Sequence, residues 1–335
     1  MNVRSAIVVV SCALTSALVF AQAGGQAPPP ADTVAPDIPG VVRGGTRVQL
    51  IRAGFQGTEG PVAMADGSLI FTEQNVNRLV KIDRDDKVST YVEDTRRTVG
   101  LGYDSKGRLI GAAQEGYILV LAPSRSVLAE SFAGQRLSRP NDLAVDRKGG
   151  VYFTDPVPAA GAPAAAPAPG APPPLPPPPP GRKSALFYIK PDGQLVMATD
   201  GVERPNGVTL SKNEKILYAT NREFLMAFDV QPDGSLRNQR TFVALVGLTR
   251  APDGTPQGGA DGLIIDDAGR LYAATGPGVQ VFSPQGKHLG TIPIPLAPQN
   301  IAFAGPDSRT LYVVGRGAAY KIAMQAQGIK NRGGR

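Results

Sequence analysis

The strongest constraint on this chain is an internal repeat. Four segments align without gaps, and in each an anchor residue opens a short apolar run and a glycine follows eight positions later. Two further segments fit the same pattern with a different turn. The six anchors are Glu59, Val99, Asn141, Asn206, Asp261 and Asn300. A second apolar run follows each turn, and the Asp-Gly and Lys-Gly pairs between runs are typical of β-hairpins.

The spacing of the anchors predicts the fold. Successive anchors lie 40, 42, 65, 55 and 39 residues apart. The longest interval contains a tract rich in Pro, Ala and Gly over 156–181, and the next longest contains a Gly- and Pro-rich loop over 244–260. A period of about 40 residues with four strands per unit is typical of propeller blades. We therefore predict an all-β, six-bladed β-propeller.

The repeat also predicts the domain boundaries. The last copy is short of a fourth strand, and residues 48–51 could fill that place and close the ring, leaving no open sheet edge. We expect the propeller to span 43–326, with 156–181 as an insertion. Residues 24–42, rich in Gly, Pro and Ala, are predicted to form a disordered leader, and 327–335 a flexible tail.

Residues 1–23 have the pattern of a secretory signal peptide. A single positive charge at Arg4 precedes an apolar run over 6–20, and Ala21-Gln22-Ala23 is a small-x-small cleavage site. We expect a periplasmic or secreted protein with no membrane attachment after cleavage; a membrane anchor, or lipidation of Cys12, are the alternatives. Cys12 is the only cysteine, so the mature chain would have neither disulfides nor thiolate metal ligands.

The charge of the chain excludes one class of partner. The net charge is +7, but no run of Lys and Arg is longer than two residues. Nucleic-acid binding needs a concentrated basic patch with interleaved aromatic residues, and the sequence has none. We expect a soluble basic surface, no nucleic-acid partner, and a monomer.

The anchors predict a metal site. The first strand of each propeller blade lines the central channel, so equivalent positions converge around the axis. Five of the six anchors carry a side-chain oxygen and two are carboxylates, a costly grouping unless a cation compensates it. All-oxygen ligation suits Ca²⁺ best, and Mg²⁺, Mn²⁺ or an oxygen-bound Zn²⁺ remain open. The only histidine, His288, is expected in an outer hairpin, remote from the axis.

A structural role for the anchors is the alternative to ligation. Asn and Asp commonly satisfy backbone groups at turns, and we expect Asn300 to do so. Residues fourteen beyond each anchor should return to the metal-bearing face, and one of them is Asp155. The Pro/Ala-rich insertion follows Asp155, so it should emerge on that face, either as a flexible rim or as a tolerated insertion without a role.

Motifs in register with the blades resemble a known family. They are Thr58–Pro61, Arg139–Asp142, Phe153–Pro156, Arg204–Gly207 and Asp261–Gly262, and the closing blade adds Asn300–Phe303, Gly305–Asp307 and Leu311–Tyr312. Together they look like the gluconolactonase family, also called the senescence marker protein 30 (regucalcin) and luciferin-regenerating-like family. The resemblance covers about residues 48–324 and implies a six-bladed propeller with one divalent metal on its axis.

The resemblance also implies roles for individual residues. Glu59, Asn206 and Asp261 would be the metal ligands, and Asp261 would also accept and donate the proton. Asn141 would contact the substrate or a metal-bound water, and Arg139 falls where some members have a substrate-binding arginine. The chain departs from the family at Gln114–Gly116, where many bacterial members have Glu-His-Gly. It also lacks the histidine that related organophosphate-hydrolysing propellers use near the metal.

The predicted function is metal-dependent hydrolysis of a small lactone, in which a metal-activated water attacks the ring carbonyl. The substrate would be a sugar lactone or a similar small molecule. A serine-hydrolase triad is untenable with one remote histidine. The main alternative is a non-catalytic, metal-stabilised propeller that acts as a binding or scaffold module, because the fold alone does not decide function. A metal-free lyase or synthase is a third possibility.

Overall fold

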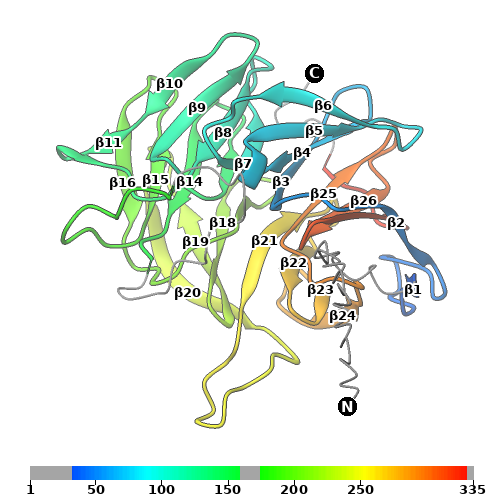
Figure 1. Cartoon of the computed structure of the whole chain (residues 1–335). Coiled ribbons are helices and arrows are strands. Elements are labelled where there is room, and N and C mark those ends of the chain that lie inside the picture. The colour runs from blue at the N-terminus through cyan, green and yellow to red at the C-terminus, as the bar shows by residue number, and fades with distance from the viewer. Residues whose placement is uncertain (1–31, 159–173, 330–335) are drawn as a thin grey trace, which may run out of the picture.

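The computed structural model describes residues 32–158 and 174–329, which form six antiparallel sheets arranged as a ring (Figure 1). Blade 1 consists of β3 (Thr58–Ala63), β4 (Leu69–Glu73), β5 (Arg78–Ile82) and β6 (Val88–Glu93), with the 3₁₀ turn η1 (Gln74–Val76) between β4 and β5. Blade 2 consists of β7 (Thr98–Tyr103), β8 (Leu109–Ala113), β9 (Tyr117–Ala122) and β10 (Ser126–Ala129). A small hairpin, β11 (Ser131–Phe132) and β12 (Gln135–Arg136), leads to blade 3.

The other four blades continue in chain order. Blade 3 consists of β13 (Leu143–Val145), β14 (Val151–Asp155), β15 (Ala185–Ile189) and β16 (Leu195–Thr199). Blade 4 consists of β17 (Val208–Leu210), β18 (Ile216–Asn221), β19 (Phe224–Val230) and β20 (Leu236–Ala244). Blade 5 consists of β21 (Ala260–Ile265), β22 (Leu271–Thr275), β23 (Gly278–Phe282) and β24 (His288–Ile292). Blade 6 contains β25 (Asn300–Ala304), β26 (Thr310–Gly315) and β27 (Ala318–Ala323). The prediction of a six-bladed propeller is confirmed.

The first strand of every blade lies on the inside of the ring. These inner strands contact one another in cyclic order, from β3 through β7, β13, β17, β21 and β25 back to β3. Each inner strand begins within two residues of its anchor and runs along the axis in the same direction as its neighbours, so the six anchors gather at one end of the axis. We call this end the anchor face.

The inner strands of blades 1, 2 and 5 are irregular at their anchors, whereas β25 of blade 6 pairs regularly from Asn300 onward. In blade 1 the pairing register with β4 shifts between Glu59 and Val62, and the inner strands of blades 2 and 5 have the same irregularity. A β-bulge bends the strand and turns a side chain away from the normal alternation. The bulge therefore directs the anchor toward the axis while the following residues return to the regular sheet.

In blades 3 and 4 the anchors also point toward the axis, although the inner strand does not extend to the anchor. Their inner strands begin two residues after the anchors Asn141 and Asn206, because Pro140 and Pro205 precede these anchors and have no N–H to donate. A threonine hydroxyl from the second strand takes over part of the pairing. Thr220 Oγ1 accepts the backbone N–H of Asn206 at 3.1 Å.

The core lies between the blades. Alternate residues of a strand face opposite sides of its sheet, so each blade packs on both neighbours. In blade 3, Phe153 stacks on Phe187 toward blade 2, and Tyr152 stacks on Tyr188 toward blade 4. Burial of such side chains stabilises the fold by about 1.5–3 kcal/mol each, which is why the blades need no helices to cover them.

The ring is closed by strands from both ends of the chain. The strand β2 (Arg47–Ala53) pairs antiparallel with β27 and supplies the fourth strand of blade 6. This confirms the expectation that residues 48–51 complete the last repeat. Beyond β2 lies β1 (Thr33–Val34), which makes blade 6 a five-stranded sheet.

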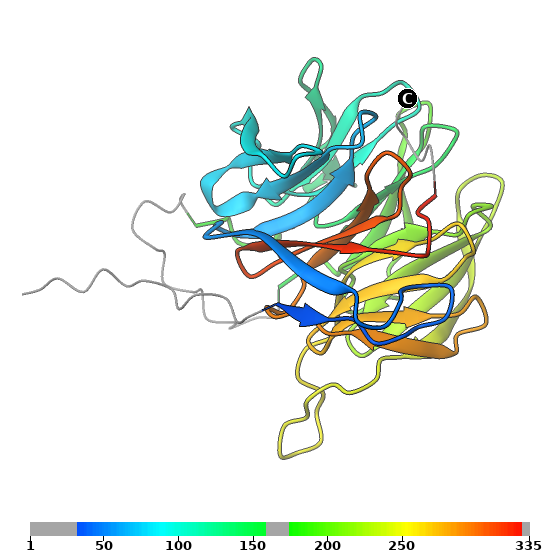
Figure 2. The same cartoon turned by 90° about the vertical axis from the view of Figure 1, so that its right-hand side faces the viewer.

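Part of the predicted leader belongs to the fold. Residues 32–42 cover blades 5 and 6, and Ile38 and Val41 are buried in the same core cluster as Tyr272 and Tyr320 (Figure 2). The prediction of a disordered leader over 24–42 is therefore wrong for residues 32–42. The reason is that the apolar side chains of Ala35, Ile38, Val41 and Val42 are buried against blades 5 and 6.

Part of the predicted tail also packs on the propeller. The backbone N–H of Gly328 donates to Ser308 at 2.8 Å, and Ile329 reaches the cavity on the axis. The expectation of a flexible tail from 327 onward is therefore wrong for residues 327–329. The N–H groups of Gln325 and Ala326 donate to Val41, so the two end segments are joined.

The other predicted segments lie partly or wholly outside the described residues. This holds for the signal peptide over 1–23, for 159–173 of the insertion and for 330–335. The described ends of the insertion lie at the anchor face, as expected, because Asp155 at the end of β14 accepts the backbone N–H of Arg139 at 2.7 Å. No helix in the described parts of the chain is long and apolar enough to cross a membrane. The loop between β20 and β21 projects from the body (Figures 1 and 2).

The packing of residues 32–42 predicts the effect of one substitution. Ile38→Ala should lower the free energy of unfolding by about 2–5 kcal/mol, because it leaves a cavity between blades 5 and 6. Val34→Ala is the matched control, since Val34 is 51% exposed, and its effect should stay within about 0.5 kcal/mol. Denaturant unfolding of the two variants and the parent measures both effects. Equal effects of the two substitutions would mean that this segment is not packed.

Candidate metal-binding and catalytic site

The carboxylate of Glu59 is held at the centre of the anchor face by blade 6. Gln299 Nε2 donates to Glu59 Oε1 at 3.1 Å, and Asn300 Nδ2 donates to Glu59 Oε2 at 3.4 Å. The Asn300 side chain also interacts with the carboxylate of Asp142. Asn300 accepts the backbone N–H of Ile301 at 2.8 Å as well, so its expected structural role is real but not its only one.

Blades 4 and 5 contribute the second half of the site. The side-chain amide of Asn206 interacts with the carboxylate of Asp261, and Asp261 lies close enough to Glu59 and Asp142 for the charges to affect one another. The structure thus brings the three predicted metal ligands, Glu59, Asn206 and Asp261, together from blades 1, 4 and 5. Glu59 is buried, while Asn206 and Asp261 are partly exposed.

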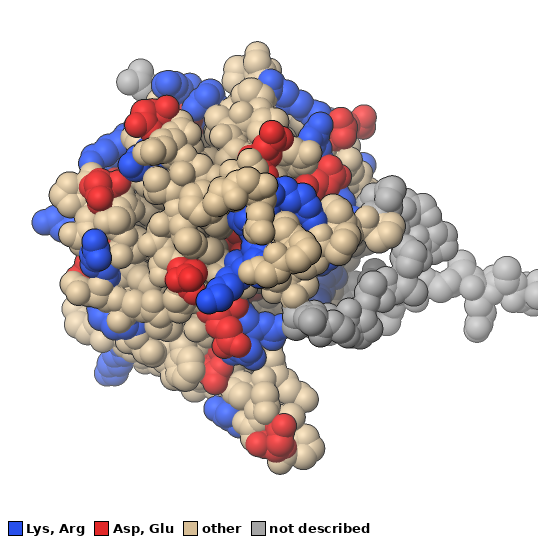
Figure 3. All heavy atoms as spheres, turned by 90° about the vertical axis from the view of Figure 1, so that its left-hand side faces the viewer, with Lys and Arg blue, Asp and Glu red and all other residues tan. Residues whose placement is uncertain are grey.

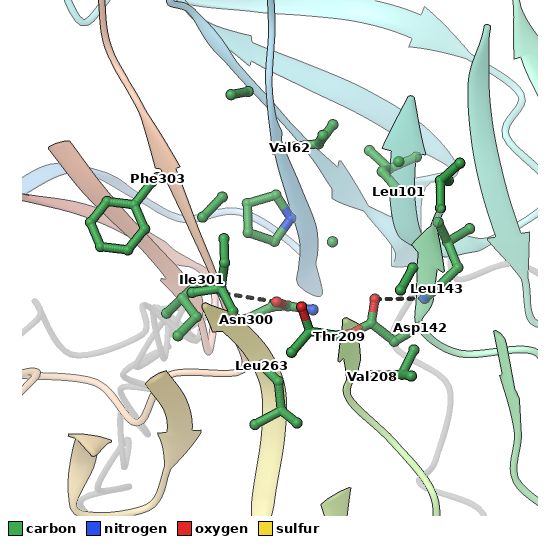
Figure 4. A pocket seen from close by; sticks show the side chains of 18 of the residues that line it. Val62, Leu101, Asp142, Leu143, Val208, Thr209, Leu263, Asn300, Ile301 and Phe303 are labelled. Carbon is green, nitrogen blue, oxygen red and sulfur yellow. Dashed lines mark hydrogen bonds between the residues drawn. The ribbon is translucent and has the colours of Figure 1, made fainter. Parts of the chain in front are cut away.

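Asp142 is a member of this site that the anchor pattern does not include. It is buried, 7% exposed, and its carboxylate lies in the pocket opposite Asn300 (Figure 4). It occupies the position immediately after the anchor. In the six blades that position reads Gly60, Gly100, Asp142, Gly207, Gly262 and Ile301. An aspartate where four blades have glycine is the sequence signal that could have identified it.

The glycines after the anchors make the site narrow. A Cβ on Gly207 would lie 2.2 Å from the carbonyl oxygen of Asp261, and one on Gly100 would lie 2.8 Å from Asp142 Oδ1. Each distance is too short for a real contact, so adjacent inner strands approach as closely as they do because these side chains are absent. The Asp142 carboxylate therefore fits beside Gly100 and not beside a larger residue.

Burial perturbs all three carboxyl groups, and charge repulsion adds to its effect on Glu59 and Asp261. The pKa of Glu59 is raised well above its ordinary value by burial first, and then by the charges of Asp261 and Asp142. Burial raises the pKa of Asp142 to about 7. Burial and the charge of Asp142 raise the pKa of Asp261, and the positive charge of Arg316 opposes that shift. Without a compensating cation, the site therefore disfavours full ionisation near neutral pH.

The residues at this site fit a hard divalent cation. All candidate donors are carboxylate or amide oxygens, and His288 lies on the outer strand β24, where its ring contacts Thr291. Within residues 32–158 and 174–329, no three His, Cys, Asp or Glu side chains are close enough to hold an ion by themselves. A bound cation would thus also need amide oxygens, which Asn206 and Asn300 offer.

The two predicted substrate-binding residues lie beside the carboxylates. Asn141 precedes Asp142 and is partly exposed; its backbone N–H donates to Thr154 and its carbonyl accepts from Gly100. Arg139 is partly buried, and its Nε has no hydrogen-bond partner in the described part of the chain. Both residues lie at the mouth of the site, and their roles in substrate binding stay predictions.

Asp155 fixes the loop that carries these residues. Its carboxylate accepts the backbone N–H groups of Ser138 at 3.0 Å and Arg139 at 2.7 Å. It also forms a buried ion pair with Arg182 at 2.9 Å, and the Arg182 guanidinium lies over the Phe187 ring. Since Asp155 and Arg182 flank the Pro/Ala-rich insertion, this ion pair holds the base of the insertion together.

Next to the Asp142 carboxylate lies a cavity of about 180 Å³ on the propeller axis. Asp142, Asn300 and Thr209 line its polar end, and apolar side chains such as Val62, Leu101 and Leu263 line the rest (Figure 4). Residues toward the far ends of the inner strands and Ile329 also line it, so it extends along the axis. The site therefore combines a polar end with an apolar interior.

Fold and site together define a six-bladed propeller with carboxylates and amides gathered at one end of its axis. Residues 57–316 match the model of the SMP-30/Gluconolactonase/LRE-like region, and the chain belongs to this family. The resemblance predicted from the motifs is thereby confirmed.

Individual relatives support a hydrolase of lactones. A gluconolactonase from Zymomonas mobilis is 27% identical over 297 residues, which cover 80% of this chain and 78% of that protein. A lactonase from Staphylococcus haemolyticus is 27% identical, covering 71% of this chain and 69% of the relative. The solved gluconolactonase of Xanthomonas campestris is 26% identical, with a TM-score of 0.71 over 89% of this chain and 98% of its own.

The raised pKa of Asp142 predicts a pH dependence in the metal-free protein. Between about pH 4 and about pH 7 the folded protein retains a proton that the unfolded chain releases, so stability is lost as pH rises through this window. Asp142→Asn removes this titration, and its Tm should fall less between about pH 5 and about pH 8 than that of the parent. Calorimetry in a chelating buffer measures the difference.

The control for this comparison is Asp267→Asn, an exposed carboxylate paired with Lys212. Its Tm should follow the parent across the same range. Parallel profiles for the parent and Asp142→Asn would show that Asp142 is ionised throughout.

The buried ion pair predicts a second stability effect. Asp155→Ala leaves Arg182 without its partner and two backbone N–H groups unsatisfied, and should lower the free energy of unfolding by about 3–5 kcal/mol. Asp229→Ala breaks the exposed pair with Arg240 and should cost at most about 1 kcal/mol. Denaturant unfolding of both variants measures this difference. Similar losses of stability in the two variants would contradict a stabilising role for the buried Asp155–Arg182 pair.

Proposed function

We propose that this protein hydrolyses a small lactone with the help of one divalent cation at the anchor face. The observation that carries the proposal is the convergence of Glu59, Asp142 and Asp261 with two amides at the mouth of an axial cavity. Three grouped carboxylates with raised pKa values oppose folding unless they serve a ligand. The lactonase relatives give the reaction class.

Glu59, Asn206 and Asp261 are the proposed metal ligands. They come from three blades that are set around the axis, so together they could surround one ion, and Asn300 is placed to orient Glu59. Calcium suits such oxygen donors best, with magnesium, manganese or oxygen-bound zinc as alternatives. A cation held there would supply Lewis-acid polarisation of the lactone carbonyl and would lower the pKa of water.

The chain's own residues then handle the proton and the orientation of the substrate. Asp261 takes the proton of the attacking water as the new C–O bond forms. It returns the proton to the ring oxygen when the lactone C–O bond breaks, which yields a hydroxy acid. A carboxyl group whose pKa is raised toward neutrality suits both steps. Asn206 fixes the orientation of Asp261, while Asn141 and Arg139 bind substrate groups at the mouth.

Export to the periplasm or secretion is proposed from residues 1–23 alone. The charged start, the apolar run over 6–20 and the small-x-small site at 21–23 support it. The mature protein is proposed to act as a monomer without nucleic-acid or membrane partners.

A lactone panel followed by proton release, with and without added Ca²⁺, tests the proposed function. Turnover should be lost with EDTA and return with the cation. Asp261→Asn and Glu59→Gln should each lower kcat/KM by about 10²-fold or more, the range expected for loss of an acid–base group or a charge-stabilising ligand. Asp267→Asn is the matched control and should retain parental turnover. Full activity of the chelated protein would refute the metal-dependent mechanism.

A further inference from the structure

Arginines recur at one position of three consecutive blades. Two residues before the anchor, blades 2, 3 and 4 carry Arg97, Arg139 and Arg204, whereas the other three blades carry Gly57, Gly259 and Pro298. The anchors gather at one end of the axis, so residues just before them lie on the rim of the same mouth. The cations therefore lie along one side of the rim.

The backbone of each arginine is fixed in the same way. The N–H of Arg97 donates to Asn77 Oδ1 at 2.8 Å, and that of Arg204 donates to Asn221 Oδ1 at 3.1 Å. In blade 3, Asp155 accepts the N–H of Arg139. Arg97 also has a left-handed backbone, with φ of 55°. Such a conformation is costly for a residue other than glycine and tends to persist at functional sites.

The arginines of blades 2 and 3 lie close to one another. Burial lowers the pKa of Arg139, and the positive charges of Arg97 and Arg136 lower it further. Arg136, from the strand β12, donates to the carbonyl oxygens of Leu137 and Pro177 rather than to a carboxylate. We call Arg97, Arg136, Arg139 and Arg204 the arginine arc.

No described carboxylate neutralises Arg136, Arg139 or Arg204 by an ion pair. Every Asp and Glu of the sequence lies within the described residues, so the segments outside them add no acidic side chain. Elsewhere the surface alternates in sign, as on the face in Figure 3. Several exposed arginines outside the arc are paired, among them Arg125 with Asp94 and Arg240 with Asp229.

We propose that the arginine arc binds an anionic group of the substrate, so that the preferred lactone carries a carboxylate or a phosphate ester in addition to its ring. Guanidinium groups bind both anions with paired hydrogen bonds. The Nε of Arg139 is a buried donor with no hydrogen-bond partner among the described residues. The proposal rests on the proposed function, because it places the lactone ring over the carboxylates and its anionic substituent against the arc.

The test compares three lactones of the same ring size: a neutral aldonolactone, one that carries a carboxylate and one that carries a phosphate ester. The parent should have the highest kcat/KM for one of the two anionic lactones, and the better one identifies the anion. Arg139→Gln and Arg97→Gln should raise KM for that lactone by about 10- to 100-fold more than for the neutral one, as expected for loss of a charged hydrogen bond.

Two further variants separate a binding role from a structural one. Arg139→Lys should recover part of the loss, because it keeps the charge but not the planar fork. Arg237→Gln removes the same charge from an exposed position on the outer strand β20 and should leave all three lactones unaffected. Equal losses for neutral and anionic lactones in Arg139→Gln, or a parental preference for the neutral lactone, would overturn the proposal.

A binding measurement distinguishes failure of this proposal from failure of the proposed function. Titration calorimetry with a hydroxydicarboxylate, inorganic phosphate and a neutral polyol measures binding to the arginine arc without any hydrolysis. Anion binding that Arg139→Gln weakens at least about tenfold would support the arc even if no lactone were hydrolysed. Hydrolysis of the neutral lactone without any anion binding would overturn the arc and leave the proposed function intact.

Discussion

The close approach of six inner strands to one axis is the constraint on which the rest of the structure depends. Glycines after four of the anchors let neighbouring strands come near enough for one blade's backbone to touch the next. The same approach forces the anchor side chains into a small volume. There burial raises the pKa values of Glu59, Asp142 and Asp261, the charge of Asp142 raises those of Glu59 and Asp261 further, and Asn206 and Asn300 interact with carboxylates. The polar groups of the site are therefore positioned by the inner strands themselves and not by long loops.

The sequence predicts the fold well because a propeller depends on a repeated local pattern. The period of the anchors, the paired apolar runs and the incomplete last copy together predict six blades and their closure by β2. The convergence of Glu59, Asn206 and Asp261 follows from that symmetry. Asp142 and the second contact of Asn300 do not, because they depend on how deeply a side chain lies between particular blades. Composition alone also does not predict that residues 32–42 are packed, since Ile38 and Val41 are buried by blades that are distant in sequence.

The anchor face separates opposite charges. Carboxylates lie at the centre, where burial penalises them, and arginines lie on one side of the rim, where Asp155 and two asparagines fix their backbones. Asp155 links the two groups, since it orders the loop between Arg139 and Asp142 and pairs with Arg182 at the end of the insertion. Substitution of this residue would therefore disturb both the cationic rim and the neighbouring acidic centre.

The pairing of β2 with β27 has a consequence for biosynthesis. β2 ends at Ala53 and β27 begins at Ala318, so nearly the whole chain must be made before the first long strand finds its partner. Such non-local pairing is slow, and it leaves a strand edge open until the last residues arrive. The ring therefore closes only after the other blades have been made, and its closure is the last folding step of the chain.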